Sequence, residues 1–302
     1  MRVAYIGYGE AGYNITKGWK EEGLHDIVAF DANKDHPVKG ELIRRRAAEV
    51  GVPLMETMEE AVRDADFIFN NTSAAVALDI SRKVLPLLQA GQTYLDLNAT
   101  SPETKEKMSN VPHADGVYFC DVGVMGGINE KAHKTKMYVS GSPEGVRLFC
   151  ETFKQYGMDL HPLDASAGGA SAIKMFKSVF SKGLPQLLFE SMLPAAKYGV
   201  LDEYMKNIDN TFKNRTVSEF ADKILSRTVV NSERRSHELE EVVSTLENMG
   251  MDADMARGTM NRLNKMVDTG LSEAIPADQI LNYKETIALV LRYYDKAQGH
   301  NA

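Results

Sequence analysis

The chain has 302 residues, 43% of them hydrophobic, and a formal net charge of −7 at pH 7. This composition is typical of a folded globular protein and excludes the disordered, fibrous and collagen-like classes. The acidic balance argues against a nucleic-acid partner, because the basic runs at 44–46 and 234–235 are too short to form a basic face.

Short β-rich runs alternate with helical stretches through the first half of the chain. Strands are expected at 2–6, 26–30, 66–69, 93–97, 117–120, 136–139 and 158–160, and helices at 11–22, 38–50, 58–64, 74–88, 102–108 and 143–153. Strands joined by helical crossovers of this length indicate a largely parallel, doubly wound sheet. We therefore expect a Rossmann-like domain over residues 1–163.

The second half of the chain, residues 164–302, has no β pattern after about Pro162 and is expected to be an all-α domain. A long interdomain helix is predicted over 170–197, and Pro185 is expected to kink it. Its apolar residues recur at helical spacing and are expected to be buried beside Lys174. Further helices are expected to break mainly at Gly199, Gly250, Gly270 and Pro276. The expected fold class is thus α/β, a doubly wound sheet followed by a helical C-terminal domain.

A glycine-rich segment follows the first predicted strand directly and opens the first predicted helix. It reads Gly7-Tyr8-Gly9-Glu10-Ala11-Gly12, which is the spacing and context of the dinucleotide fingerprint. In this motif the first glycine permits a tight turn, the second lets the backbone approach a pyrophosphate, and the third lets the helix pack on the strand. The motif predicts a pyrophosphate site at the start of the helix.

Asp31 lies at the end of the second predicted strand, nineteen residues after Gly12. A carboxylate at this point accepts the ribose hydroxyls of the adenosine half and repels a 2′-phosphate. We therefore expect NAD as the cofactor, with Asn33 beside it in the same turn. NADP stays open, because Lys34 could pair with a 2′-phosphate.

Two further strand ends are expected to face the same crevice, since ligands of open α/β sheets bind beyond the carboxyl ends of the strands. Both carry small hydroxyl and amide groups, and the candidates for contact with the nicotinamide half are Thr72, Ser73, Asn98 and Thr100. Such residues also favour helix starts, so Thr72, Ser73 and Ser101 are predicted to be N-caps as well.

With these features in place, the chain resembles the β-hydroxyacid dehydrogenase family, which includes 3-hydroxyisobutyrate and 6-phosphogluconate dehydrogenases. It is most similar to the phosphogluconate-dehydrogenase-like branch, and the likeness covers nearly the whole chain. The matching segments are 120–127 (CDVGVMGG), 136–141 (KMYVSG) and 169–174 (GASAIK), followed by Glu190 and Gly199 on the long helix. The resemblance implies an NAD(P)-dependent dehydrogenase acting on a small anionic substrate.

Lys174 is the general acid/base that the resemblance implies. It shares a helix face with Ser178, and partial burial there would lower the pKa of its amine. Met125, Gly126 and Gly127 match the substrate segment of the family, in which open backbone N–H groups receive an anion. Several positions depart from the family pattern: Gly123 stands for a proline, Met125 for a serine, Lys177-Ser178 replaces an asparagine, and His237-Glu238 replaces a lysine–aspartate pair.

The helix predicted around 231–249 turns polar groups inward in its first half, and such groups must be hydrogen-bonded or line a wet cavity. Arg235 is therefore a candidate clamp for a substrate carboxylate. The alternative is a buried ion pair of Arg235 with Glu190 or Glu238. His237 is a candidate contact to the nicotinamide end of the cofactor, or else a structural histidine.

The cysteines and the remaining histidines give no sign of a metal or disulfide framework. Cys120 and Cys150 lie in apolar runs, and no metal-ligand spacing or nucleophile elbow is present. Together with the lack of a long apolar stretch, this favours a cytoplasmic protein without a membrane contact. A homodimer is expected, because the long helix has more apolar surface than its own neighbours can cover. An imine reductase, or a dinucleotide-binding sensor without catalysis, are the alternative functions.

Overall fold

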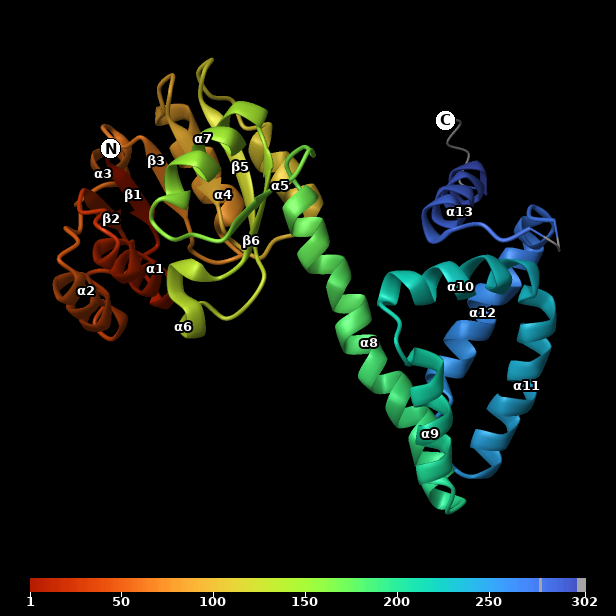
Figure 1. The fold of residues 1–302 in the computed structure, drawn as a ribbon. Helices are drawn as coiled ribbons and strands as arrows, with labels where there is room; N and C mark the ends of the chain where they lie inside the picture. The colour runs from red at the N-terminus through yellow and green to blue at the C-terminus, as the bar shows by residue number, and fades with distance from the viewer. Residues whose placement is uncertain (277–278, 298–302) are drawn as a thin grey trace. The chain divides into compact units, whose positions relative to one another are not determined.

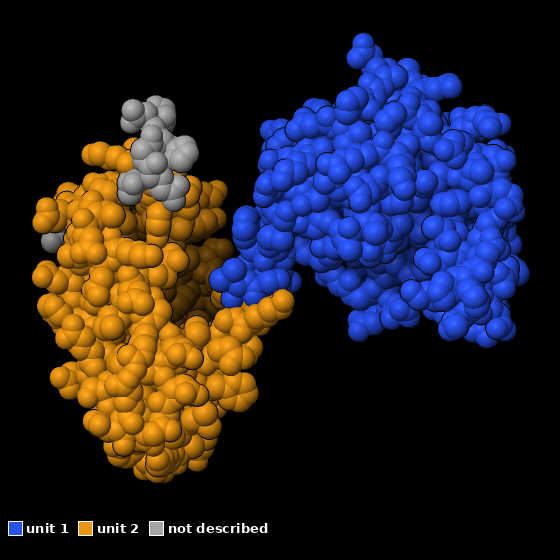
Figure 2. Space-filling view, turned by 180° about the vertical axis from the view of Figure 1, so that it is seen from behind, with its two compact units in different colours: residues 1–179 blue, residues 180–302 orange. Residues whose placement is uncertain are grey.

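The computed structural model describes residues 1–276 and 279–297 (Figure 1). The chain divides into two compact units, Met1–Val179 and Phe180–Ala302 (Figure 2). This division falls inside one long helix, α8 (Gly169–Lys197), which contributes to both units. The domain boundary expected at residue 164 stays a prediction.

The first unit contains a seven-stranded sheet with the order β2-β1-β3-β4-β5-β6-β7. Neighbouring strands are parallel except for the antiparallel pair β5–β6. The strands are β1 (Val3–Ile6), β2 (Ile27–Phe30), β3 (Phe67–Asn70), β4 (Thr93–Asp96), β5 (Tyr118–Val124), β6 (Met137–Gly141) and β7 (Leu160–Pro162). The expected Rossmann-like, doubly wound α/β fold is confirmed.

Helices cover both faces of the sheet (Figure 1). They are α1 (Glu10–Glu21), α2 (Lys39–Val50), α3 (Met58–Val62), α4 (Ala77–Val84), η1 (Leu85–Leu87), α5 (Pro102–Ser109), α6 (Ile128–Lys131), η2 (Ala132–Lys134) and α7 (Pro143–Lys154). Side chains alternate between the two faces of each strand, so the sheet has a core on either side. Trp19, Phe69 and Phe153 anchor one core, and Ile68, Tyr94 and Phe119 anchor the other.

All expected strands exist, and their ends lie within two residues of the prediction except at the end of β5. The strand expected to end at Cys120 continues to Val124, because residues 120–124 pair antiparallel with β6. The last strand begins at Leu160, two residues later than expected, where it pairs with β6. The short helix α6 was not predicted, since its four residues have no apolar periodicity to detect.

The second unit is built from helices. After α8 come α9 (Leu201–Phe212), α10 (Val217–Val230), α11 (Ser232–Asn248), α12 (Asp254–Asp268), η3 (Leu271–Glu273) and α13 (Tyr283–Ala297). The helix α8 continues as one element through both Pro185 and Pro194. Among the described residues no helix is long and apolar enough to cross a membrane.

Two small cores hold these helices together. Val243 and Leu246 of α11 pack with Ala253 and Ala256 at the start of α12. Val229 of α10 packs with Leu271 and Ile275, close to the inner face of α13. The glycines at 199, 250 and 270 end helices as expected, each with a positive φ that L-residues rarely adopt.

Candidate functional site

The glycine-rich segment forms the turn between β1 and α1, next to the point where the strand order reverses between β1 and β3. Gly7 has a φ of +86°, and a Cβ there would lie 2.7 Å from the Thr72 side chain. A Cβ on Gly12 would lie 2.9 Å from the Tyr5 ring, so this glycine lets α1 approach the strand closely. Gly9 faces open space, since a Cβ on this residue would have no heavy atom within 4 Å. The turn therefore leaves room for a ligand only at Gly9.

The N-terminus of α1 presents free backbone donors to that space. Gly9 is the N-cap residue, and no side chain caps the helix. The first N–H groups of a helix lack intrahelical partners and attract anions. Glu10 and Ala11 supply the first of these donors, whereas Tyr8 directs its side chain into the core and donates its own N–H elsewhere.

Asp31 lies directly beyond β2 and is 7% exposed. Its carboxylate accepts the N–H of Tyr8 at 2.7 Å and the N–H of Asn33 at 2.8 Å. A carboxylate has about four acceptor positions, so these two bonds leave capacity for hydroxyl donors. The Lys34 amine lies 2.5 Å from Glu56 and is only 12% exposed, so a carboxylate already occupies it.

A cleft of about 350 Å³ brings together five of the other sequence-predicted residues of the first unit, namely Thr72, Ser73, Asn98, Gly126 and Lys174. Its walls come from the loops after β3 and β4, the end of β5, α6 and the first turns of α8. The lining residues are Asn71, Thr72, Ser73, Ala74, Leu97, Asn98, Ala99, Val124, Gly126, Ile128 and Lys174. Thr100 lies just outside this set, buried, with a hydroxyl that has no partner among the described residues.

The predicted helix caps beside the cleft are confirmed only in part. The Ser101 hydroxyl accepts the N–H of Thr104 and caps α5 as expected. For α4 the prediction was wrong, since Val76 is the N-cap residue and no side chain caps the helix. Thr72 instead donates its hydroxyl to Asn70 at 3.2 Å, and Ser73 is exposed at the cleft.

Lys174 reaches the cleft from the second turn of α8 and is half-buried. Burial lowers the pKa of its amine; the positive charge of Lys105 acts in the same direction, and Asp121 opposes both. Ser178 follows one turn later, half-buried, and lies within 3.5 Å of the Lys174 carbonyl. The expectation of a buried apolar arc beside Lys174 was wrong, because Phe176 is 63% exposed and Val179 is 75% exposed.

Beneath the cleft a row of polar side chains crosses the sheet, and sequence reasoning missed it as a unit. Asn70, Asp96, Asp121 and Ser140 are register partners on β3 to β6, and all are fully buried. Lys105 of α5, also fully buried, places its amine 2.5 Å from Asp96 and 3.1 Å from Asp121. Two carboxylates within apolar strands were a usable signal, since buried charges require a partner.

The segment that matches the family's substrate motif lies at the end of β5. A Cβ on Gly126 or Gly127 would meet nothing closer than 3.5 Å, so both glycines are open toward solvent. Met125 is half-buried and donates its N–H to Lys136. Gly123, which replaces the family's proline, has a structural reason: a Cβ there would lie 2.6 Å from the carbonyl oxygen of Ala170 on α8.

The second unit carries Arg235 and His237 on α11. Among the described residues, the hydrogen-bond partner of the half-buried Arg235 guanidinium is the Thr228 hydroxyl at 2.9 Å. The alternative prediction, a buried ion pair of Arg235 with Glu190 or Glu238, was wrong. Glu190 accepts two N–H groups at the start of α12, and Glu238 pairs with Arg234 instead. His237 is exposed.

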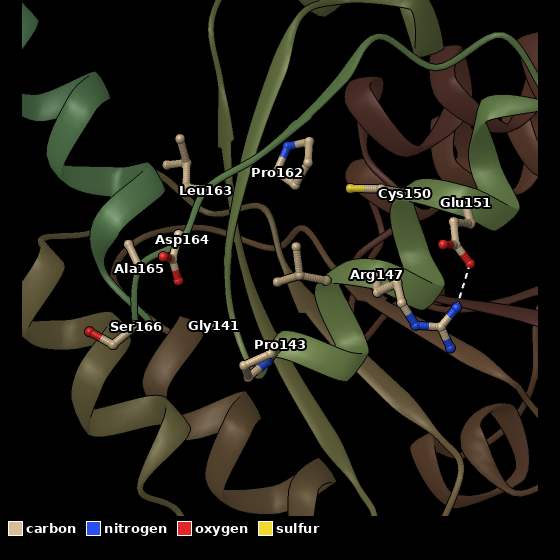
Figure 3. Close-up of a pocket in the computed structure, with 11 residues that line it drawn as sticks. Gly141, Pro143, Arg147, Cys150, Glu151, Pro162, Leu163, Asp164, Ala165 and Ser166 are labelled. Carbon is tan, nitrogen blue, oxygen red and sulfur yellow. Dashed lines mark hydrogen bonds and ion pairs between the residues drawn. The ribbon is translucent and has the colours of Figure 1, made fainter.

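A second groove of the first unit, about 870 Å³, lies between α7 and the loop that follows β7 (Figure 3). Among the described residues that line this groove, Arg147 is the one with a cationic side chain. It points toward Glu151 in the figure and also pairs with Glu144. None of the residues that were predicted to bind cofactor or substrate lines this groove. Among the described residues no group of three or more His, Cys, Asp or Glu side chains could hold a metal ion, and both cysteines are free.

A family model for the NAD binding domain of 6-phosphogluconate dehydrogenase matches residues 2–165. The chain belongs to this family. A further model, a domain of unknown function named DUF1932, matches residues 195–266. Residues 2–165 are thus an NAD-binding domain, as the glycine-rich segment indicated, and the chain is an oxidoreductase.

Relatives share this architecture over most of their length. An uncharacterised 28.5 kDa protein of Methanothermus fervidus is 26% identical over 86% of this chain and 97% of its own. An imine reductase from Myxococcus stipitatus, a variant in complex with NAD⁺, is 16% identical over 90% of this chain and 95% of its own, with a TM-score of 0.71. The 3-hydroxyisobutyrate dehydrogenase of Mycobacterium tuberculosis is 15% identical over 96% of this chain and 99% of its own, with a TM-score of 0.60. The two solved structures show that the fold is shared.

Proposed function

We propose that this protein is an NAD-dependent dehydrogenase that interconverts a small β-hydroxy acid and its aldehyde or keto acid. One observation carries the proposal: the Lys174 side chain lines the same cleft as the loops that follow β3 and β4. Those loops stand at the carboxyl ends of parallel strands beside the nucleotide turn, where the substrate of a doubly wound sheet binds.

The residues present fit a bound NAD. The open space at Gly9 and the uncapped start of α1 suit a pyrophosphate. Asp31 suits the adenosine ribose, and the engagement of Lys34 by Glu56 leaves that lysine poorly placed to receive a 2′-phosphate. Thr72, Ser73 and Asn98 line the part of the cleft where the nicotinamide half would lie.

When bound, NAD supplies the carbon that accepts a hydride from the carbinol carbon of the substrate. Lys174 in its neutral form takes the hydroxyl proton as the C–H bond breaks, which leaves a carbonyl group and a protonated amine. In the reverse direction the ammonium returns that proton to the carbonyl oxygen. The ammonium also stabilises negative charge that develops on the oxygen. The lowered pKa of Lys174 increases the neutral fraction of the amine near neutral pH.

The substrate carboxylate would bind at the backbone N–H groups of Gly126, which lines the cleft, and of Gly127 beside it, because a Cβ on either glycine would meet no heavy atom closer than 3.5 Å. Ser178 adds a hydroxyl on the same face of α8 as Lys174. Met125 replaces a polar side chain and makes this part of the pocket less polar. Arg235 and His237 belong to the second unit, so their expected roles at the substrate carboxylate and at the nicotinamide end stay predictions.

The first prediction concerns Lys174→Met, which keeps the length of the side chain and removes the amine. Turnover should fall by about 10²- to 10⁴-fold, the usual contribution of a general acid/base, while NAD affinity stays within twofold. The measurement is steady-state oxidation of hydroxy acids together with calorimetric NAD binding. Lys177→Met, at an exposed position three residues along, is the matched control and should behave as the wild type.

A substrate panel separates the alternative functions. Hydroxy acids and cyclic imines are offered to the wild type with NADH or NAD⁺ and again with the phosphorylated cofactors. Oxidation of an acid supports the proposal, whereas reduction of imines alone makes the protein an imine reductase. NAD binding without any turnover, unaffected by Lys174→Met, would leave a dinucleotide-binding sensor.

A further inference from the structure

Two buried side chains of the sheet hold the start of α8: Ser140, whose hydroxyl accepts the Ala170 N–H at 3.0 Å, and the carboxylate of Asp121, which accepts three donors. Asp121 accepts the N–H groups of Gly168 at 3.2 Å and Ser171 at 2.9 Å, and the Ser171 hydroxyl at 2.7 Å. These donors belong to the first turn of the helix and the residue before it, where backbone N–H groups otherwise lack partners. Lys174 follows Ser171 by three residues, so the position of its backbone depends on this contact.

Asp121 is itself held by Lys105. Both side chains are fully buried; the Lys105 amine forms an ion pair with Asp121 at 3.1 Å and donates to the carboxylate and the carbonyl of Asp96. The side-chain amides of Asn70 and Asn98 donate to the other oxygen of Asp96 at 2.7 and 2.8 Å, and the Asn98 backbone N–H donates to the first oxygen at 3.2 Å. The Lys105 amine is thus engaged by Asp96 and Asp121, and Lys105 is not among the residues that line the cleft.

The charge of Lys105 also acts on the Lys174 amine. Buried charges are screened little by solvent, so a fixed ammonium near a second amine disfavours protonation of that amine. The charged groups that act on Lys174 in the first unit are Lys105 from α5 and Asp121 from β5. The other residues lining the cleft carry amide, hydroxyl or apolar groups.

We propose that Lys105 is a positioning residue for the Lys174 amine: from the buried row it holds Asp121 where that carboxylate caps α8, and the two opposite charges of this pair act on the helix turn that carries Lys174. This inference rests on the proposed function for its catalytic meaning. The contact set from Lys105 through Asp121 to the first turn of α8 exists independently of any substrate.

The test measures the reactivity of Lys174 without turnover. Trace acetylation by acetic anhydride over a pH series, read by mass spectrometry on the peptide that contains Lys174, reports the fraction of neutral amine. Lys105→Met removes the repelling cation and should lower that fraction about three- to tenfold at pH values below the transition. Asp121→Asn removes the attracting anion and should raise it.

The double variant Lys105→Met with Asp121→Asn guards against misfolding, because it removes the two opposite charges together. The amide oxygen that this variant carries at position 121 can still accept from the helix start, and the reactivity of Lys174 should return toward the wild-type profile. Lys107→Met on the exposed side of α5, where Lys107 pairs with Glu103, is the matched control and should change nothing.

Opposite changes in the reactivity of Lys174 in the two single variants would support the inference. A simple displacement of α8 would instead change the reactivity of Lys174 in the same direction in both variants. Shifts of the same sign, or none in either variant, would overturn it. Failure of the proposed function is seen in a different measurement, because turnover would then survive in Lys174→Met. It would not alter the pH profile of acetylation at Lys174.

Discussion

At the scale of one residue, we propose that Asp31 decides which dinucleotide the nucleotide turn accepts. Its carboxylate accepts the Tyr8 N–H of the turn and the Asn33 N–H. The role was predicted from the sequence position of Asp31 and stays a proposal. The hydrogen bond from the Tyr8 N–H to Asp31 could not be predicted, because it depends on how the turn folds back over β2.

The second prediction therefore concerns Asp31→Asn. Loss of the charge removes repulsion of a 2′-phosphate, so the ratio of NADP affinity to NAD affinity should rise about tenfold or more. Fluorescence titration of both cofactors measures this ratio. An unchanged ratio would contradict the role given to Asp31. Asp35→Asn, four residues along on an exposed turn, serves as the control.

At the scale of elements, the contact between β5 and α8 positions the site. The sequence predicted both elements and the strand ends around the cleft, since hydrophobic periodicity and the glycine spacing are local properties. It did not predict that Asp96 and Asp121 are register partners joined by Lys105, because strand register and the direction of a buried amine are set by the tertiary fold. The exposure of Phe176 was missed for the same reason: periodicity identifies an apolar face but not what covers it.

The third prediction compares two glycines. Gly123→Ala would place a Cβ 2.6 Å from the Ala170 carbonyl and force β5 and α8 apart, so we expect a loss of about 1–3 kcal/mol in unfolding free energy. Gly9→Ala meets no atom of the protein and should keep its stability while NAD affinity falls. Urea denaturation and cofactor titration separate the two effects. Equal stability losses in both variants would contradict the assigned roles.

At the scale of the whole molecule, the described chain leaves much apolar surface uncovered along α8. Phe176, Val179, Phe180, Leu184 and Leu187 share one face of the helix by their spacing, and each is more than a third exposed. Contiguous apolar surface of this kind marks an interaction face, and we propose that a second copy of the chain covers it.

The fourth prediction follows from this surface. The wild type should sediment as a dimer at micromolar concentration, and Val179→Asp should shift it toward the monomer, because a buried charge without a partner is costly. Analytical ultracentrifugation over a hundredfold concentration range measures the equilibrium. Val217→Asp, on an exposed position of α10, is the control substitution. A wild type that stays monomeric throughout would contradict the dimer.

The division of the chain at residue 179 leaves the nucleotide turn, Asp31, the buried charged row and Lys174 all within one unit. On the proposed function, the parts that hold the dinucleotide and move the proton are inherited as a single folded block. The helical block after residue 179 can then change in sequence without altering the parts that carry out the redox step.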